Sequence, residues 1–293
     1  MSTNVSGADA SADASASADA SAKVSGASSS ASGGPAWVLG TGDPARPAPW
    51  LRMALALASY ELRLAARRGE SLLITFVIPA GVLLVFSTFD TTGGAGSGQP
   101  VDRILPGSIA LAVIAASLVS LAIATGFERS YGVIKRLGGS PAGTSALVAS
   151  KTVSVVVVEA IEIALLLVIA AGALGWSAGQ GASAALFVAG LLLGTVAFAG
   201  LGLLLAGTLR AEATLAVANL LFLLSLVLGG IVVPLDRLPP AVASIAHDLP
   251  PAALTQVLTV GLGGSGDATE SLAILAGWAV LLAVLAARYF RWD

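Results

Sequence analysis

The sequence has 293 residues, of which 56% are hydrophobic and 11% are charged, and its mean hydropathy is +0.90. Because an ordinary soluble domain carries about 25% charged residues, this composition excludes a water-soluble enzyme, whose surface it cannot cover. The net charge of -2 and the aromatic content of 5% disfavour a nucleic-acid-binding protein, while the lack of Cys and the single His, His247, exclude disulfides and multi-His metal centres. A polytopic membrane protein remains.

The first segment of the chain differs from the rest. From Ser2 to Gly34 it consists largely of Ala, Ser, Gly and Asp. It contains no apolar stretch of the roughly 7–15 residues that a secretory leader needs, and it buries too little surface to offset the entropy of the chain. We therefore predict a disordered tail over residues 1–49 and a transmembrane domain over residues 50–293.

A helix is predicted immediately before the first apolar run. Between residues 50 and 68, arginines recur on one stripe of a helix and aliphatic residues recur on another. This arrangement is typical of an amphipathic helix that lies in the headgroup interface, and a solvated helix is the alternative.

Apolar runs that are long enough to cross a bilayer follow. A hydrocarbon core of about 30 Å requires about 20 apolar residues in a helix, and the segments between the runs are too polar or too rich in Gly and Pro to cross lipid. We predict about six spans, near residues 71–89, 104–127, 149–176, 183–209, 214–233 and 272–289. The predicted fold class is an all-α integral membrane protein.

The distribution of Lys and Arg orients these spans. Every second loop is basic, through Arg52, Arg63, Arg67, Arg68, Arg129, Lys135, Arg136, Lys151, Arg210, Arg288 and Arg291, whereas the opposite loops hold only Arg103 and Arg237. Because basic loops stay in the cytoplasm, both termini are predicted to be cytoplasmic. The excess of Arg over Lys, together with abundant Ala and Gly, indicates a bacterial chain of high GC content and hence the bacterial cytoplasmic membrane.

The loop between the fifth and sixth spans is unlike the others. Pro234, Pro239 and Pro250 bracket two short apolar pieces, residues 241–246 and 252–262. Each piece is about half a span long, so the loop is predicted to form a re-entrant helical hairpin on the outer side. His247 and Asp248 are expected to mark a helix boundary in this loop and not a catalytic dyad.

The sequence offers no motif for catalysis or for a cofactor. Its nearest approach to a phosphate-binding loop, Ser150-Lys151-Thr152, has Ser where the motif needs Gly before Lys, and it opens an apolar run instead of following a strand. A G-x-S-x-G nucleophile elbow is absent. The chain is therefore predicted to be no enzyme and to bind no nucleotide, cofactor or metal itself.

Residues 128–141 form the most densely charged loop between spans. Glu128 is expected to begin a short helix along the membrane, with Lys135 and Arg136 near its end, because the helix dipole favours these signs at these places. A basic loop that only sets the topology is the simpler interpretation.

Two motifs of the chain resemble the membrane subunits of type-2 ATP-binding-cassette (ABC) exporters. The family pattern E-R-x-x-G-x-I/L-K-R-L-x-x-S/T-P is matched by Glu128, Arg129, Gly132, Ile134, Lys135, Arg136, Leu137, Ser140 and Pro141. The family's P-L-x-x-L-P stretch with a following Leu-Pro is matched by Pro234, Leu235, Leu238, Pro239, Leu249 and Pro250, although Pro240 and Pro251 double the family's single prolines. The resemblance extends from about residue 50 to the C-terminus.

This resemblance implies that transport and ATP hydrolysis are carried out by separate subunits. The membrane subunits of the family dimerise and dock onto two copies of a separate cytoplasmic ABC subunit, which binds ATP and Mg and hydrolyses the ATP, and the loop at residues 128–141 would be the coupling element. The resemblance also implies export by alternating access. A hydrophobic or amphipathic cargo (a drug, an antibiotic or a lipid) fits the aliphatic spans best, and such efflux would confer antibiotic resistance.

Two acidic residues stand inside the third predicted span. Glu159 and Glu162 lie on one face of a helix because they are three residues apart. Counting back from Trp176 places Glu159 near the inner interface, whereas starting the span at Ala149 places both residues near mid-depth. The first register needs only water, and the second predicts a polar site in the translocation pathway.

Two polar residues of the fifth span are further candidates for this pathway. Asn219 and Ser225 either form hydrogen bonds between helices or line a cavity. The alternative function is a proton-coupled secondary transporter that uses Glu159 and Glu162, although the chain shows no internal repeat of the kind that such folds often carry.

Overall fold

The computed structural model describes residues 49–67, 69–89, 99–133 and 143–290. The chain divides into two units, residues 1–47 and 48–293, and all described residues belong to the second. The predicted disordered tail lies outside them. Within the described residues every regular element is a helix, which confirms the all-α fold class.

The predicted spans correspond to long helices of the structure. Among the described residues, five apolar segments are long enough to cross a membrane, namely Pro100–Ser130, Val148–Ala173, Ala184–Thr208, Ala211–Leu228 and Thr269–Tyr289. The first predicted span corresponds to helix α3 (Gly69–Phe89), whose apolar part within the described side chains is Phe76–Thr88. The chain is thus a multi-pass protein by the length and composition of its helices, and the total of six spans stays a prediction.

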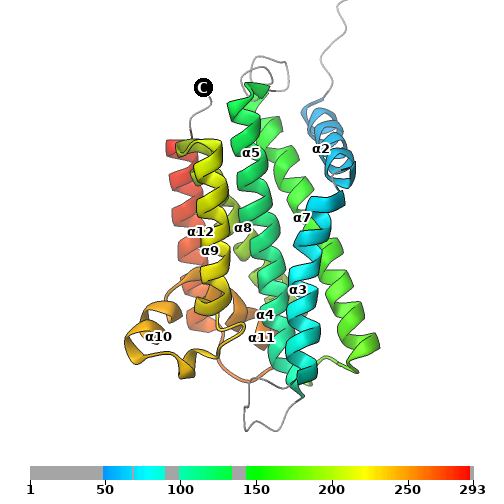
Figure 1. Ribbon diagram of the computed structural model, residues 1–293, viewed down its shortest axis with the longest axis vertical. Helices are drawn as coiled ribbons and strands as arrows, with labels where there is room; N and C mark the ends of the chain where they lie inside the picture. Colours follow the sequence, from blue (N-terminus) through cyan, green and yellow to red (C-terminus); the bar gives the residue numbers. More distant parts are fainter. Residues whose placement is uncertain (1–48, 68, 90–98, 134–142, 291–293) are drawn as a thin grey trace, which may run out of the picture. The chain divides into compact units, whose positions relative to one another are not determined.

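The long helices run side by side between two ends of this unit (Figure 1). Their bounds are α4 (Pro100–Ile114), α5 (Leu121–Ser130), α7 (Gly143–Ala173), α8 (Ala184–Thr208), α9 (Ala211–Leu228) and α12 (Thr269–Tyr289). Helix α2 (Trp50–Arg67), the end of α5, the corner between α8 and α9 and the end of α12 lie at one end, and helices α10 (Pro240–His247) and α11 (Pro250–Gly261) lie at the other. The alternation expected from the basic loops is therefore present in the fold.

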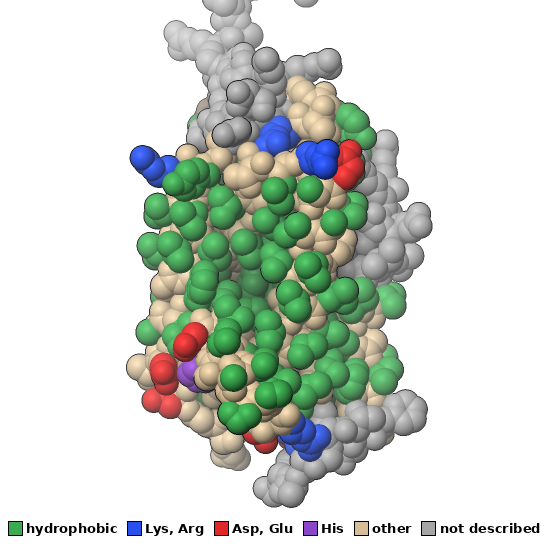
Figure 2. Space-filling view, turned by 60° about the vertical axis from the view of Figure 1, so that its left-hand side comes forward, with side chains coloured by type: hydrophobic (Ala, Val, Ile, Leu, Met, Phe, Trp, Pro, Cys, Tyr) green, Lys and Arg blue, Asp and Glu red, His purple; other side chains and the backbone are tan. Residues whose placement is uncertain are grey.

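Helix α4 runs through the interior. Residues 104–114 are all buried, and α4 packs against α3, α7, α8 and α11. A helix that is apolar on every side has no polar face to expose to solvent, and this explains why the segment lies at the centre. On the outer helices, by contrast, large hydrophobic side chains are exposed, and they cover most of the face in Figure 2 while charged side chains lie near its two ends.

Helices α4 and α5 are joined without a break by a π-helical turn, η1 (Ala115–Ser120). The sequence predicted a regular helix here, because an aliphatic run carries no signal that distinguishes a π turn from an α turn. Such turns insert an extra residue per turn and are frequent at functional sites. Here the π turn contacts α8 and α9 and sets how α5 leaves the core.

The predicted outer hairpin is present as two short helices that differ in burial. Pro239 is the N-cap of α10, Pro250 is the first residue of α11, and Pro234 precedes a 3-10 turn, η2 (Leu235–Arg237). Proline fits such positions because the first helical N–H groups have no partner in the helix. His247 ends α10 as predicted, and α10 itself is mostly exposed, whereas α11 is largely buried among α4, α8 and α12.

Helix α11 approaches the backbone of α8 closely. A Cβ atom at Gly190 would lie 2.7 Å from Val257 Cγ1, and one at Gly194 would lie 2.8 Å from Leu254 Cδ1. Glycines four residues apart form a groove on one helix face, so the G-x-x-x-G sequence of α8 accommodates a half-span helix of the same chain.

Helix α2 packs mainly on α7. Its contact stripe consists of Ala54 and Ala58, which are 3% and 2% exposed, followed one turn later by Glu61. The larger apolar residues of this helix, which the sequence placed in the headgroup interface, are partly or largely exposed. Small side chains allow the two helix backbones to come close, and this leaves the larger ones to face the surroundings.

Candidate functional site

A buried lysine joins three helices at the basic end of the domain. Lys151 on α7 is 5% exposed, and its Nζ lies 2.6 Å from Glu128 Oε2 on α5 and 3.4 Å from Glu61 Oε1 on α2. Burial raises the pKa of Glu61, and the charge of Lys151 opposes this effect. We call these three residues the Lys151 cluster. Sequence reasoning treated Lys151 only as a topology signal and as part of an incomplete phosphate-binding loop.

The next residue of the family motif contacts a different part of the fold. Arg129 donates a hydrogen bond from Nη2 to the carbonyl oxygen of Leu209, at a distance of 2.9 Å. Leu209 is the C-cap of α8, where the helix dipole favours a cation. Successive residues of a helix point about 100° apart, so Glu128 and Arg129 tie the end of α5 to two sets of neighbours at once.

The expectation that Glu128 begins a separate helix is wrong. Glu128 lies in the last turn of α5, which continues to Ser130, and Tyr131 caps it. The chain turns only at Gly132, whose φ of 69° is a left-handed conformation that favours glycine. Helix α5 extends this far because Glu128 and Arg129 find partners on neighbouring helices. Lys135, Arg136 and Pro141 lie outside the described residues, so a coupling helix there stays a prediction.

The carboxyl groups of Glu159 and Glu162 lie deep within α7. These residues are 4% and 2% exposed. They straddle the centre of the apolar segment Val148–Ala173, with Glu159 eleven residues after its start and Glu162 eleven residues before its end. Glu159 Oε2 accepts a hydrogen bond of 2.7 Å from Thr195 Oγ1 near the middle of α8. The structure therefore favours the mid-depth register over the interfacial one.

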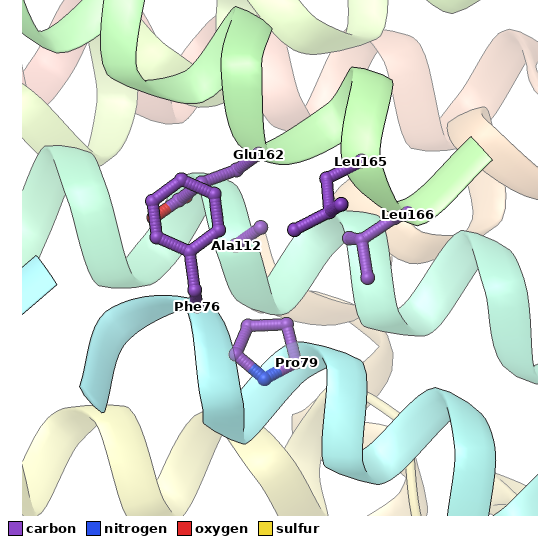
Figure 3. Close-up of a pocket in the computed structure, with 6 residues that line it drawn as sticks. All are labelled: Phe76, Pro79, Ala112, Glu162, Leu165 and Leu166. Carbon is purple, nitrogen blue, oxygen red and sulfur yellow. The ribbon is translucent and has the colours of Figure 1, made fainter. Parts of the chain in front are cut away.

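Glu162 lines a crevice between helices. Both of its carboxylate oxygens are buried without a hydrogen-bond partner among the described residues, and so is Glu159 Oε1. The crevice is lined by Phe76, Pro79, Ala112, Glu162, Leu165 and Leu166. Figure 3 shows the Phe76 ring and the Glu162 side chain pointing toward each other from α3 and α7.

The other two candidates for the translocation pathway lie elsewhere. Asn219 is exposed near the centre of α9 and donates from Nδ2 to the carbonyl oxygen of Leu215 at 2.9 Å. Ser225 is buried and donates to the carbonyl oxygen of Leu221 at 2.7 Å. Helix α9 packs on α5, η1 and α8, whereas Glu162 faces α3 and α4. The four predicted residues thus form two separate groups, because sequence spacing does not reveal which helix faces pack together.

Together, these features define an all-α, multi-pass membrane component in which Glu128 and Arg129 anchor the end of α5 to neighbouring helices. The sequence profile of the ABC-2 type transporter family matches residues 54–262, from within α2 to the end of α11. The chain belongs to this family and is a membrane subunit of a type-2 ABC transporter. Membership implies a separate ATP-binding ABC partner subunit. A search of curated proteins finds no significant match.

Proposed function

We propose that this chain is the permease of an ATP-driven exporter in the bacterial cytoplasmic membrane, with residues 50–293 as its transmembrane domain. Two copies of the chain pair with two copies of the ABC subunit, which binds ATP and Mg and supplies the hydrolysis. The cargo is a hydrophobic or amphipathic molecule such as a drug, an antibiotic or a lipid. Efflux of an antibiotic would protect the cell that makes or meets it.

The observation that carries this proposal is the double attachment of the end of α5. Glu128 connects it through Lys151 to α7 and α2, and Arg129 connects it to the corner between α8 and α9. A displacement of the adjoining loop by the ABC subunit would therefore act on four other helices together. Rigid movement of these helices is what alternating access requires, provided that the loop contacts differ between the two states of the ABC subunit.

The orientation follows from the charges at the two ends. Among described residues, Arg52, Arg63, Arg129, Lys151, Arg210 and Arg288 belong to the end that contains α2 and the end of α12, whereas Arg103 and Arg237 belong to the end that contains α10. Basic residues stay on the cytoplasmic side. This supports cytoplasmic termini and a cytoplasmic site for the ABC subunit.

A second copy of the chain would cover the exposed face of α9. This face carries Leu215, Leu220, Leu223, Leu224 and Val227 around Asn219. An amide at the centre of a span is costly against lipid and stabilising when it pairs across two helices. In a two-fold symmetric dimer a residue on the symmetry axis meets its own copy, so two α9 helices that cross at Asn219 can pair these side chains.

A proton-coupled secondary transporter is the second candidate. The observation that favours it is the burial of Glu159 and Glu162 in the middle of the apolar segment of α7, since carboxyls within a span often serve as proton relays. The two functions differ in their energy source. Transport that persists in vesicles without ATP, driven by a pH gradient, would support this second candidate.

Purification from native membranes tests the exporter proposal. The tagged chain is expected to retain an ABC subunit in a one-to-one ratio, and the complex is expected to hydrolyse ATP. Replacement of Glu128 and Arg129 by Ala should keep the subunits together while cargo no longer stimulates hydrolysis, and Arg52→Ala, an exposed residue of α2, serves as the control. Isolation of the chain without any ATPase, or full coupling in the double variant, would contradict the proposal.

A further inference from the structure

The crevice at Glu162 combines an acidic group with apolar walls from three helices. Phe76 and Pro79 come from α3, Ala112 comes from α4, and Leu165 and Leu166 accompany Glu162 on α7. Figure 3 shows these side chains gathered on the α7 side of α3. The walls offer hydrophobic contact and one aromatic ring, and the only polar atoms that they surround belong to a carboxyl group.

No described side chain compensates the acidic pair. Ion pairs among the described residues are made by Lys151 and His247, and neither contacts Glu159 or Glu162. Lys151 lies eleven residues before Glu162, about 16 Å along the helix, and is already paired with Glu128. A buried acid normally has a partner, so the unpaired oxygens of Glu162 point to a positively charged ligand.

The form of the crevice narrows the class of this ligand. A metal cation needs about six or more oxygen ligands, and the described residues contain no cluster of three metal-ligating side chains. The crevice as it stands has no room even for a water molecule, so it has to widen before it binds any ligand. A carboxylate beside an aromatic face and aliphatic side chains instead suits an organic cation with a hydrophobic body.

The crevice can open toward the hydrocarbon of the membrane. Helix α3 packs mainly along α4 and only lightly on α7, and Leu165 and Val77 beside the crevice are exposed. Pro79 lacks the N–H that would bond one turn back, which allows a helix to bend, and a side chain at Gly81 would meet no neighbour. A bend of α3 at Pro79 would widen the crevice, and it would also shift Val82 and Leu83, which belong to the core.

We propose that Glu162 binds a lipophilic monocation, which enters from the lipid between α3 and α7 and places its positive charge between the carboxylate and the Phe76 ring. Glu159, whose Oε2 accepts a hydrogen bond from Thr195, places a second carboxyl on the same helix one turn away. Binding of the cation does not depend on the proposed function. The further statement that this cation is the exported cargo rests on the proposed function.

Equilibrium binding of tetraphenylphosphonium tests the proposal. The chain is purified with its ABC subunit into lipid nanodiscs, and binding of the radiolabelled cation is measured without ATP. The wild type should bind the cation, Glu162→Gln should bind it at least tenfold more weakly, and Phe76→Ala should show a smaller loss. Uncharged triphenylphosphine oxide, which has similar apolar groups, should bind weakly and equally to the wild type and to Glu162→Gln.

Control variants distinguish the loss of the binding site from unfolding of the protein. They also distinguish a failure of the binding proposal from a failure of the exporter proposal. Glu162→Asp keeps the charge and should retain most of the binding, and apparent melting temperatures confirm that each variant is folded. Wild-type affinity in Glu162→Gln, or no saturable binding to the wild type, would overturn the proposal. If no ABC subunit co-purifies, binding to the chain alone still answers the question, so failure of the exporter proposal is recognised separately.

Discussion

Two pairs of glutamates in this protein, one partly buried and one buried, have opposite surroundings. Glu61 and Glu128 at the basic end share Lys151, which lies within ion-pair distance of both. Glu162, in the middle of the apolar segment of α7, has two oxygens without a described partner. A paired charge holds helices together, whereas an unpaired one costs free energy that a structural role does not repay. The comparison teaches that the first group serves the architecture and that the second is available to a ligand.

Removal of Lys151 should have the largest effect on stability. In Lys151→Met two partly buried acids lose their cation, and breaking a buried ion pair costs about 3–5 kcal/mol. The acids are 20% and 27% exposed, so we expect about 2–3 kcal/mol here. The apparent melting temperature in nanodiscs measures the loss, with Arg52→Ala as a matched control. A melting temperature equal to that of the wild type would show that the Lys151 cluster is not structural.

Neutralising one glutamate should lower stability in the first group and should not lower it in the second. Glu128→Gln removes the shorter contact of Lys151 and should cost about 1–2 kcal/mol, a typical value for a charged hydrogen bond. Glu162→Gln removes an unpaired buried acid and should leave the melting temperature equal or higher. The two variants are compared in one thermal unfolding series. A large loss of stability in Glu162→Gln would mean that this carboxyl has a structural partner.

The bond between α7 and α8 should contribute a smaller amount. Thr195→Val keeps the shape of the side chain but removes the hydroxyl that donates to Glu159, at an expected cost of about 1 kcal/mol. Thr208→Val is the matched control, because the Thr208 hydroxyl bonds only to Leu204 of its own helix. Equal melting temperatures for the two variants would show that the hydrogen bond between Thr195 and Glu159 contributes nothing to stability.

The smallest expected effect is a dependence on pH. Burial raises the pKa of Glu61 above its ordinary value of 4.5, so the folded protein holds this proton more tightly than the unfolded chain. Stability should therefore fall slightly as pH rises from 4.5 through the raised value, and it should be regained on acidification. Glu61→Gln should flatten this part of the profile of melting temperature against pH. If the slope of melting temperature against pH is the same in Glu61→Gln as in the wild type, the pH dependence arises from another titratable group.

The local pattern of the sequence predicted much of the fold. Predicted bounds of 183–209 correspond to α8, which runs from Ala184 to Thr208, because the length of an apolar run and a capping residue such as Ser183 are local features. The two short helices α10 and α11 were found in the same way from their prolines. The π turn at Ala115–Ser120 was missed, since its cause lies in the packing of neighbouring helices and not in its own residues.

The candidate sites were predicted as residues but not as assemblies. Glu128 and Arg129 were identified from a motif, yet their partners Lys151 and Leu209 are far away in the chain. Asn219 and Glu162 were grouped because both are polar residues in apolar spans, and the structure separates them. A one-dimensional pattern gives the face of a helix that a residue occupies, and it does not give the helix that this face meets.

The amino-acid sequence by itself determined that this protein is helical, that it crosses a membrane several times and which of its loops are basic. These features depend on the length of apolar runs and on the charges between them, and both are properties of consecutive residues. Tertiary structure alone decided that Lys151 joins three helices, that Gly190 and Gly194 receive α11, and that Glu162 faces Phe76 without a described partner. These outcomes depend on distances between residues that are remote in the chain, and such distances arise only when the helices pack.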